Sequence, residues 1–220
     1  MSVLIDQLFI GRTRLMLPEG GETGIYKDAV AHAVELGATG LAGDEQGDLR
    51  NHGGTEKALH QFPAEHYVVL AEQWPERAGL LQPGVLGENI SSHGMLEDEV
   101  CIGDVYRIGG ARVQVSQPRA PCWKIDRRIK VEDASRFVEA AGVTGWYYRV
   151  LKPGPIAAGD AIELLERPNP DWTLARYWEV VIAHRPDPAA LRAVAALPGL
   201  APDKVVRWTE RAVWLEANGS

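Results

Sequence analysis

Short runs of alternating apolar and polar residues recur along the first three quarters of the chain and predict a sheet-rich core. The alternation typical of strands with one buried face is present in residues 2–10, 111–116, 144–151 and 161–165. Residues 100–108 and 111–116 flank Gly109-Gly110, so we predict a hairpin that turns at this glycine pair. Residues 25–34 mix apolar and polar positions with β-branched side chains and predict a further strand or hairpin.

Two helices are predicted within this strand-rich part. Pro63 suits a first helical position, and the residues that then share one face are His66, Val69, Leu70, Gln73 and Trp74. Residues 132–141 predict a short helix that ends at Gly142, because glycine suits the left-handed cap. Residues 11–24, 41–54 and 84–94 are rich in glycine and polar side chains and predict loops, of which 41–54 is long and a candidate for function.

After residue 170 the pattern changes to three short amphipathic helices, in residues 173–183, 187–195 and 205–215. Their apolar faces are formed by Leu174, Tyr177, Trp178 and Val181, by Leu191, Val194 and Ala195, and by Val205, Trp208, Ala212 and Leu215. Three such helices cannot bury their own apolar faces, so we expect them to pack on the sheet-rich part or on another chain. We therefore divide the chain into residues 1–166 and 167–220.

The composition is that of an ordinary globular protein, with 45% apolar and 24% charged residues. The net charge of −7 argues against general electrostatic binding to nucleic acid or to an anionic membrane, although it is compatible with a local basic pocket. No apolar run approaches the length of a membrane span, and no secretory signal pattern is visible. The two cysteines make neither a disulfide scaffold nor a CxxC motif, so a cytoplasmic location is expected.

Residues 116–124, Ser-Gln-Pro-Arg-Ala-Pro-Cys-Trp-Lys, place a cysteine on a stiff loop directly after a predicted strand. The two prolines fix their own φ angles and restrict the residues before them. Arg119 and Lys124 would favour a thiolate at Cys122 if they point at it. Such a loop suits a metal ligand or a nucleophile. A cysteine that acts only as a small buried hydrophobe is the commoner case in general, but the flanking residues here favour function.

Three further segments carry candidate ligand-binding residues. In residues 51–57, Asn-His-Gly-Gly-Thr-Glu-Lys, the glycines let backbone N–H groups approach an anion, and His52 and Lys57 add donors or charge. A turn that needs glycine geometry explains this segment equally well. Asn89 offers both a donor and an acceptor, although an asparagine in a turn is the simpler interpretation. Arg149 is either a ligand clamp or a surface charge on a strand.

The histidines do not have the spacing of a metal site. Pro63 interrupts the segment between His60 and His66, so no His-x-x-x-His pair lies on one helix, and a zinc site is poorly supported. Cys122 has no partner histidine at a recognisable spacing, so nothing in the sequence prompts a thiol protease or amidase. Cys101 lies within a strand pattern and is assigned to the core.

Several of these segments occur together, and in order, in one known family. They are Gly24-Ile-Tyr-Lys27, Gly40-Leu-Ala-Gly-Asp-Glu-Gln46, His52-Gly-Gly54, Gly87-Glu-Asn-Ile90, Gly103-Asp104, Gln117-Pro-Arg-Ala-Pro-Cys122 and Gly145-Trp-Tyr-Tyr-Arg-Val-Leu151. With them the chain resembles the MOSC family, named for the C-terminal domain of molybdenum cofactor sulfurase, and within it the stand-alone bacterial YiiM-type branch. The Gln-Pro-Arg-x-Pro-Cys segment is the most specific. The resemblance covers residues 2–166, and the helical tail is similar to the small all-α domain of that branch.

The resemblance implies an α+β, mainly β fold: a MOSC-type β-barrel with peripheral helices, followed by a small three-helix subdomain. It also implies a molybdenum cofactor, a molybdopterin that carries molybdenum, with Cys122 as the single protein ligand to the metal. The residues implied to hold the cofactor's phosphate are Lys27, His52, Gly53 and Gly54. Those implied to hydrogen-bond the pterin or the oxo ligands are Asn89, Gln117 and Arg119, and Asn89 is grouped with Cys122 as catalytic.

The implied reaction is the two-electron reduction of an N-hydroxylated compound, R–NHOH to R–NH2, which would detoxify mutagenic base analogues such as 6-hydroxylaminopurine. Electrons would come from a separate NAD(P)H-dependent flavoprotein, since nothing in the chain resembles a GxGxxG nucleotide fold. Trp123 and Trp146 either stack a purine substrate or belong to the core.

Two alternatives stay open: a sulfur carrier with a persulfide on Cys122, and a non-catalytic binder of the cofactor. No nucleic acid or membrane partner is expected, and a homodimer stays open.

Overall fold

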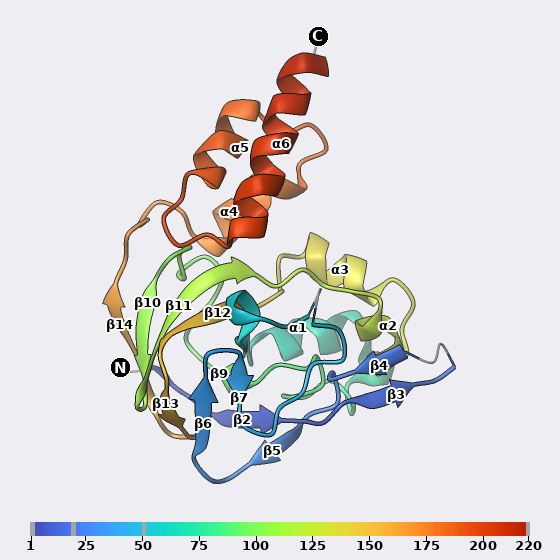
Figure 1. Cartoon of the computed structure of the whole chain (residues 1–220). Helices are drawn as coiled ribbons and strands as arrows, with labels where there is room; N and C mark the ends of the chain where they lie inside the picture. Colours follow the sequence, from blue (N-terminus) through green and yellow to red (C-terminus); the bar gives the residue numbers. More distant parts are fainter. Residues whose placement is uncertain (1–2, 19–20, 50–51, 219–220) are drawn as a thin grey trace.

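The strands predicted from alternation join into one curled nine-stranded sheet, which dominates the computed structural model of residues 3–18, 21–49 and 52–218 (Figure 1). In sheet order the strands are β1 (Val3–Leu4), β14 (Ala161–Glu166), β10 (Val105–Ile108), β11 (Ala111–Pro118), β12 (Trp146–Lys152), β8 (Leu59–Pro63), β9 (Ile90–Ser92), β2 (Gln7–Ile10) and β5 (Asp28–Val30). The pairs are antiparallel except for β8 and β9, which run parallel. The hairpin predicted at Gly109-Gly110 is confirmed, because Ile108 pairs with Ala111 across the turn.

Two smaller sheets complete the strand-rich part. One contains β13 (Gly154–Ile156), β6 (Val34–Gly37) and β7 (Gly40–Leu41), and the other is the hairpin of β3 (Arg14–Met16) and β4 (Gly21–Thr23). The prediction of a loop over residues 11–24 is therefore wrong where this hairpin forms. The sequence signal is weak there because Arg14 and Leu15 are both exposed, so β3 lacks a continuous buried face.

Three short helices cover one side of the curled sheet: α1 (His66–Gln73), α2 (Lys124–Ile129) and α3 (Ala134–Ala140). The 3-10 turn η1 (Thr55–Lys57) lies between β7 and β8, and η2 (Pro75–Arg77) directly follows α1. The helix predicted before Gly142 is confirmed as α3, and Gly142 has φ 69°. Helix α2 was not predicted, because six residues with buried side chains only at Ile125 and Ile129 give almost no periodic signal.

The prediction for α1 needs two corrections. Pro63 ends strand β8 and does not begin the helix, which starts at His66. Val69 and Gln73, expected on the buried face, are exposed, whereas Tyr67 is buried beside His66 and Leu70. Strand β8 is buried at every position, so it shows no alternation that would reveal a strand.

The three helices predicted after residue 170 are confirmed as α4 (Leu174–Ile182), α5 (Pro188–Ala195) and α6 (Pro202–Asn218). Thr173 caps α4 by accepting a hydrogen bond from the Arg176 backbone N–H at 3.2 Å. Asp187 caps α5 through the Ala189 N–H at 3.0 Å, with Pro188 at the first helical position. No helix within the described residues is long and apolar enough to cross a lipid bilayer.

These C-terminal helices pack on the sheet-rich part, which is one of the two arrangements expected from the sequence. Their buried faces belong to the same apolar cluster as the interior of the nine-stranded sheet. Trp178 Nε1 donates to Thr144 Oγ1 at 3.0 Å, and the Ala201 N–H donates to the Ser116 carbonyl at 2.9 Å. The second bond places the beginning of α6 beside the last residues of β11. The predicted α+β, mainly β class is confirmed.

Candidate functional site

The cysteine loop connects the end of β11 to the start of α2. The Arg119 N–H donates to the Gly145 carbonyl at 3.0 Å, which ties the loop to the turn before β12. The Cys122 carbonyl accepts a hydrogen bond from the Ile125 N–H at 3.0 Å and so begins the helical turn that follows. Cys122 itself is a free, half-buried thiol. The prediction of a constrained cysteine directly after a strand is confirmed, and the helix behind it further restricts its position.

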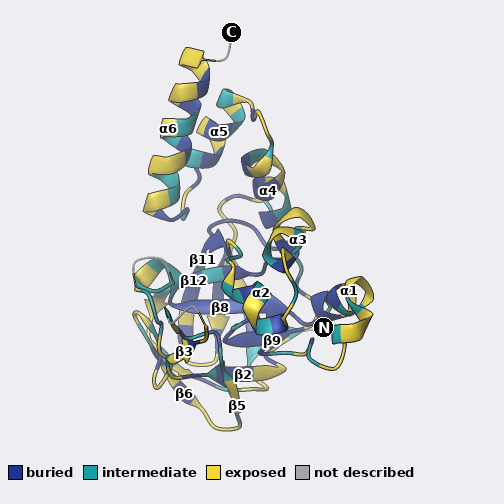
Figure 2. Cartoon of the chain, turned by 90° about the vertical axis from the view of Figure 1, so that its right-hand side faces the viewer, coloured by how far each residue is buried: buried dark blue, intermediate teal, exposed yellow. Residues whose placement is uncertain are grey.

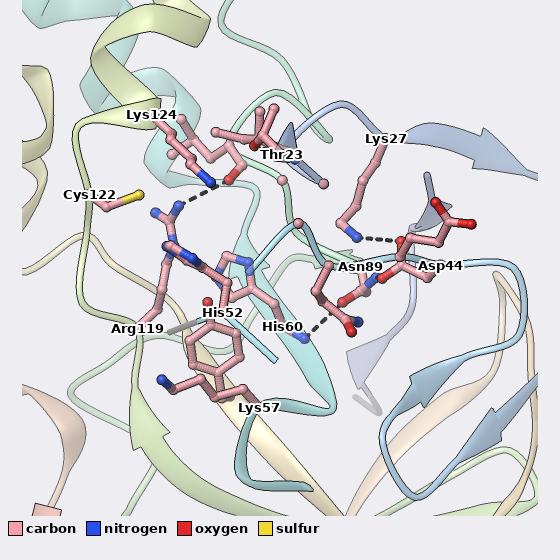
Figure 3. Close-up of a pocket in the computed structure, with 18 residues that line it drawn as sticks. Thr23, Lys27, Asp44, His52, Lys57, His60, Asn89, Arg119, Cys122 and Lys124 are labelled. Atoms are coloured by element: carbon pink, nitrogen blue, oxygen red, sulfur yellow. Dashed lines mark hydrogen bonds and ion pairs between the residues drawn. The ribbon is translucent and has the colours of Figure 1, made fainter. Parts of the chain in front are cut away.

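A pocket opens beside this thiol, and segments far apart in the sequence line it (Figure 3). Its lining residues are Thr23, Gly24, Ile25, Lys27, Asp44, Glu45, Gln46, Gly47, His52, Lys57, His60, Leu86, Gly87, Asn89, Arg119, Cys122, Lys124 and Tyr147. The fold thus brings together Lys27, His52, Asn89, Arg119 and Cys122 from the predicted site residues.

The other predicted site residues, Gly53, Gly54 and Gln117, lie outside the pocket lining. Gln117 is buried on β11, where it pairs in register with Tyr147 of the lining. Gly54 has φ 90°, a conformation that side chains rarely adopt. A side chain at Gly53 would approach the Leu49 side chain to 2.9 Å. Loop geometry alone accounts for both glycines, and their contact with a phosphate stays a prediction.

Asp44 organises the floor of the pocket. Lys27 Nζ is bonded to Asp44 Oδ1, and both side chains are almost completely buried. The Gly11 N–H also donates to Oδ1, at 2.8 Å, and Asn89 Nδ2 donates to Oδ2 at 2.9 Å. Burial lowers the pKa of Lys27, and the adjacent Asp44 carboxylate opposes that change. Lys27 therefore enters the pocket as half of an ion pair, not as an uncompensated positive charge.

The Asn89 side chain is held by the protein on both of its polar atoms. Its Nδ2 donates to Asp44 and to the Phe9 carbonyl at 3.2 Å, while its Oδ1 accepts the His60 N–H at 3.1 Å. Because both amide hydrogens are engaged, the observed role of Asn89 is to fix Asp44 and strand β8 relative to each other. Its predicted hydrogen bond to a cofactor stays a prediction.

Buried nitrogen atoms without a hydrogen-bond partner among the described residues surround the pocket. They are Arg119 Nη1, His52 Nδ1 and His60 Nε2, whereas Arg119 Nη2 donates to the Leu86 carbonyl at 3.2 Å. Unpaired buried polar atoms are rare in proteins and commonly mark the place of a ligand or ordered water. Burial lowers the pKa of His60 well below its ordinary value, and burial together with Lys124 and Arg119 lowers that of His52.

Asp44, His60 and Tyr147 are among the lining residues that were not assigned to the site from the sequence. Strand geometry explains why Tyr147 faces the pocket. Successive side chains in β12 point to opposite faces, and Trp146 is fully buried in the core of the sheet. The suggestion that Trp146 stacks a purine is therefore wrong. Trp123 is 45% exposed and lies outside the pocket lining, so Tyr147 is the aromatic side chain of the described pocket.

Glu88, beside the lining residues Gly87 and Asn89, is completely buried. Its Oε1 accepts hydrogen bonds from Tyr67 Oη at 2.6 Å and from the Gly84 N–H at 2.5 Å, while Oε2 has no partner among the described residues. Burial is the largest influence on the carboxyl, and it raises the pKa of Glu88 above the ordinary 4.5.

A pH-dependent stability is expected from this carboxyl. Between pH 4.5 and the raised pKa, the folded protein binds a proton that the unfolded chain releases, so stability falls as pH rises. Relative to Glu88→Gln, the wild type is expected to lose up to about 1.4 kcal/mol per pH unit in this window. Urea unfolding of both proteins between pH 4 and 8 measures the difference. Parallel stability profiles would contradict the assignment.

The MOSC domain family model matches residues 48–163, which is more than half of the chain. The chain belongs to the MOSC domain family. Within that family its relatives include YiiM of Escherichia coli (strain K12), 40% identical over 150 residues that make up 68% of this chain and 67% of YiiM. The uncharacterized protein YflK of Bacillus subtilis (strain 168) is 44% identical over 146 residues, or 66% of this chain and 65% of YflK.

A fungal relative and two solved structures extend this likeness. A protein named "Reductase" from Gibberella moniliformis is 41% identical over 167 residues, which span 74% of this chain but only 30% of the fungal protein. The crystal structure of YiiM from Geobacillus stearothermophilus has a TM-score of 0.80 at 30% identity, covering 96% of this chain and 99% of that one. E. coli YiiM has a TM-score of 0.80 at 28% identity, covering 100% and 94%. The predicted YiiM-type MOSC membership is confirmed.

Proposed function

We propose that this protein is a molybdenum-cofactor-dependent reductase of N-hydroxylated compounds such as 6-hydroxylaminopurine. The observation that carries the proposal is one pocket that joins the Cys122 thiol to buried nitrogens without hydrogen-bond partners among the described residues. Membership in a family whose domains generally bind the molybdenum cofactor supports the choice of cofactor. The name of the fungal relative supports a reductive reaction.

The donor set of the pocket fits such a cofactor. Among residues 3–18, 21–49 and 52–218, no group of three histidine, cysteine or acidic side chains converges to hold a metal ion. A metal bound at Cys122 must therefore bring most of its own ligands, as a pterin dithiolene does. A thiolate is a soft ligand that suits a sulfur-rich centre. The cations Lys57, Arg119 and Lys124 line the same pocket and suit an anionic phosphate.

Each side chain then has a specific task. Cys122 Sγ would bind the metal, and Arg119 Nη1, which is buried and has no partner among the described residues, would donate to the pterin or to an oxygen ligand. The phosphate contact is assigned to Lys124 in preference to Lys27, because Asp44 already compensates the Lys27 charge, and Lys57 lines the same pocket. Lys124 is oriented by donating its Nζ to the Glu22 carbonyl at 3.0 Å.

The bound cofactor supplies the two-electron redox chemistry. The overall change is R–NHOH plus two electrons and two protons to R–NH2 plus water, so the site must also deliver protons. Tyr147 lines the pocket close enough to Cys122 and Arg119 for both to influence its ionisation. Burial raises the pKa of Tyr147, which keeps the phenol protonated at neutral pH. We assign its hydroxyl as the donor of one proton to the departing hydroxyl group.

Tyr147→Phe is expected to lower kcat about 100-fold, the lower end of the range for losing a general acid. Molybdenum and pterin content should stay at the wild-type level, because the phenyl ring preserves the shape of the pocket wall. Steady-state kinetics together with metal analysis of both proteins check this. A wild-type kcat in the variant would show that another group donates the proton.

The proposed function is tested on protein expressed in a host that makes the cofactor. Molybdenum and pterin are quantified, and consumption of 6-hydroxylaminopurine is followed with reduced methyl viologen as the electron source. We expect near-stoichiometric cofactor and conversion to 6-aminopurine. Cofactor without turnover would identify a non-catalytic binder. Sulfane sulfur on Cys122 in protein that lacks molybdenum would identify a sulfur carrier. Either of these last two results would overturn the reductase.

A further inference from the structure

Positive charge is concentrated in one short segment of an otherwise acidic chain. Residues 119–130 contain five lysine or arginine side chains and a single aspartate, whereas the whole chain has a net charge of −7. The aspartate, Asp126, is engaged by the Ser135 N–H at 2.7 Å and so serves the start of α3. The net charge of this segment is therefore positive, whereas that of the whole chain is negative.

The outward side of this segment is what we name the α2 surface, formed by Trp123, Lys124, Arg127, Arg128 and Lys130. Trp123, Arg127 and Lys130 are exposed, and α2 lies on the face turned to the viewer in Figure 2. Trp123 is 45% exposed, which is unusual for the largest side chain in a protein of this size. The α2 surface thus combines one exposed aromatic ring with several cations, and the acidic residues Asp126, Glu132 and Asp133 line the same hollow as Trp123, Arg127 and Lys130.

This surface is held firmly by neighbouring elements. The Arg128 guanidinium lies 4.8 Å from the centroid of the Tyr26 ring, and Arg77 Nη2 donates to the Lys130 carbonyl at 3.1 Å. Lys130 ends α2 in the left-handed conformation with φ 59°. The positive charges therefore occupy a structured helix and its cap, so their positions need little further ordering when a partner binds.

The α2 surface is also continuous with the candidate site. Trp123 directly follows Cys122, and Lys124 belongs both to the first turn of α2 and to the lining of the pocket. A protein seated on this surface would therefore lie beside the Cys122 thiol, whereas the far end of α6 rises away from it, although the first residues of α6 lie near the pocket-lining Lys57. Figure 1 shows α6 rising away from the sheet-rich part towards the C-terminus.

We propose that the α2 surface docks the electron donor, and that this donor is a flavoprotein with an acidic face around its exposed flavin. The inference rests on the proposed function. In each turnover the reduced flavin would be oxidised, and its two electrons would reduce the substrate through the cofactor that Cys122 would hold. The N–O bond of the substrate breaks, two protons are taken up and water leaves. Opposite charges steer the encounter and fix the orientation, while an aromatic side chain such as Trp123 is a typical binding hot spot.

The test compares two electron sources on cofactor-loaded protein. The donors are a flavodoxin, kept reduced by its NADPH-dependent reductase, and reduced methyl viologen at saturating concentration. The variant is the double charge reversal Arg127→Glu/Lys130→Glu, and the matched control is Arg185→Glu/Arg207→Glu on exposed positions of the C-terminal helical part. We expect kcat/KM for flavodoxin to fall about tenfold or more in the α2 variant, with a weaker salt dependence, because electrostatic steering is lost. Turnover with viologen and both activities of the control should stay within about twofold of wild type.

A second pair of variants separates this surface from an exposed tryptophan elsewhere. Trp123→Ala should raise the KM for flavodoxin, whereas Trp214→Ala, which removes a ring that is 61% exposed on α6, should not. A raised KM only in the Trp214 variant would place the donor on the helical tail and overturn the inference. Equal losses with both donors in the α2 variant would indicate damage to the site and would also overturn it.

The outcomes also distinguish this inference from the proposed function. Wild-type protein that is inactive with viologen would overturn the reductase itself. Protein that is active with viologen but inactive with flavodoxin would overturn the acidic flavoprotein as the partner. Protein that is active with both donors and unaffected by the α2 charge reversal would leave the reductase in place and remove its docking site from α2.

Discussion

Cys122→Ala is expected to lose bound molybdenum and pterin almost completely, and with them all reduction of hydroxylaminopurine. The physical reason is that Cys122 is the cysteine that lines the pocket, and no cluster of other donors among the described residues replaces it. Stability should change by less than about 1 kcal/mol, because the thiol is half-buried and its removal opens little space. Metal analysis and the fluorescence of the released pterin measure the loss directly, without relying on activity.

Cys101→Ala is the matched control for this experiment. Cys101 is 1% exposed, with its Sγ 3.7 Å from the Pro170 carbonyl, and it lies outside the pocket lining. Its replacement should lower the free energy of unfolding by about 1 kcal/mol while the cofactor content stays at the wild-type level. Full cofactor retention in Cys122→Ala, or equal loss in both variants, would contradict the assignment of Cys122 as the ligand.

Asp44→Ala is expected to destabilise the protein by about 3–5 kcal/mol, as measured by urea unfolding at pH 7. The change leaves Lys27 buried without its counter-ion, and the Gly11 N–H and Asn89 Nδ2 lose an acceptor. The burial that lowers the Lys27 pKa is then unopposed, so the folded state favours the neutral amine. Stability of the variant should consequently rise with pH below the ordinary Lys27 pKa of 10.5, and more steeply than in the wild type.

Two further variants serve as controls for the Asp44→Ala result. Asp28→Ala breaks the exposed ion pair with Arg14 and should cost less than about 1 kcal/mol, since its side chains are 80% and 55% exposed. Lys27→Met/Asp44→Leu removes both buried charges and should be more stable than Asp44→Ala. A loss below about 1 kcal/mol in Asp44→Ala would mean that the pair is not buried as described.

The buried pair also helps to make the floor of the pocket rigid. Asp44 and Asn89 tie together the segments before β5, after β7 and before β9, so the floor of the pocket is internally satisfied. On the walls, Arg119, His52 and His60 each keep a buried nitrogen that has no hydrogen-bond partner among the described residues. This division keeps the ligand-facing donors positioned before any ligand binds, which reduces the ordering that binding would otherwise require.

The sequence by itself determined the features that depend on neighbouring residues. The hairpin at Gly109-Gly110, the caps at Thr173 and Asp187, the buried faces of α4 to α6 and the stiff loop before Cys122 are all local. Each results from turn chemistry, capping or a helical period that a short window contains. The resemblance to the MOSC family also predicted five residues that line the pocket, because the order and spacing of the family's motifs reflect the same fold. These residues are Lys27, His52, Asn89, Arg119 and Cys122.

Only the tertiary structure decided which strands are buried on both faces and which side chains of a strand face the core or the pocket. Strand β8 is buried along its whole length, so it has no alternation, and Pro63 could be mistaken for a helix start. The curl of the sheet places Trp146 inside and turns Tyr147 to the pocket, and alternation alone does not decide which of the two faces the core. Asp44 joins Lys27 and Asn89 across separations of 17 and 45 residues. Such pairings depend on how distant strands register, and no local pattern encodes that register.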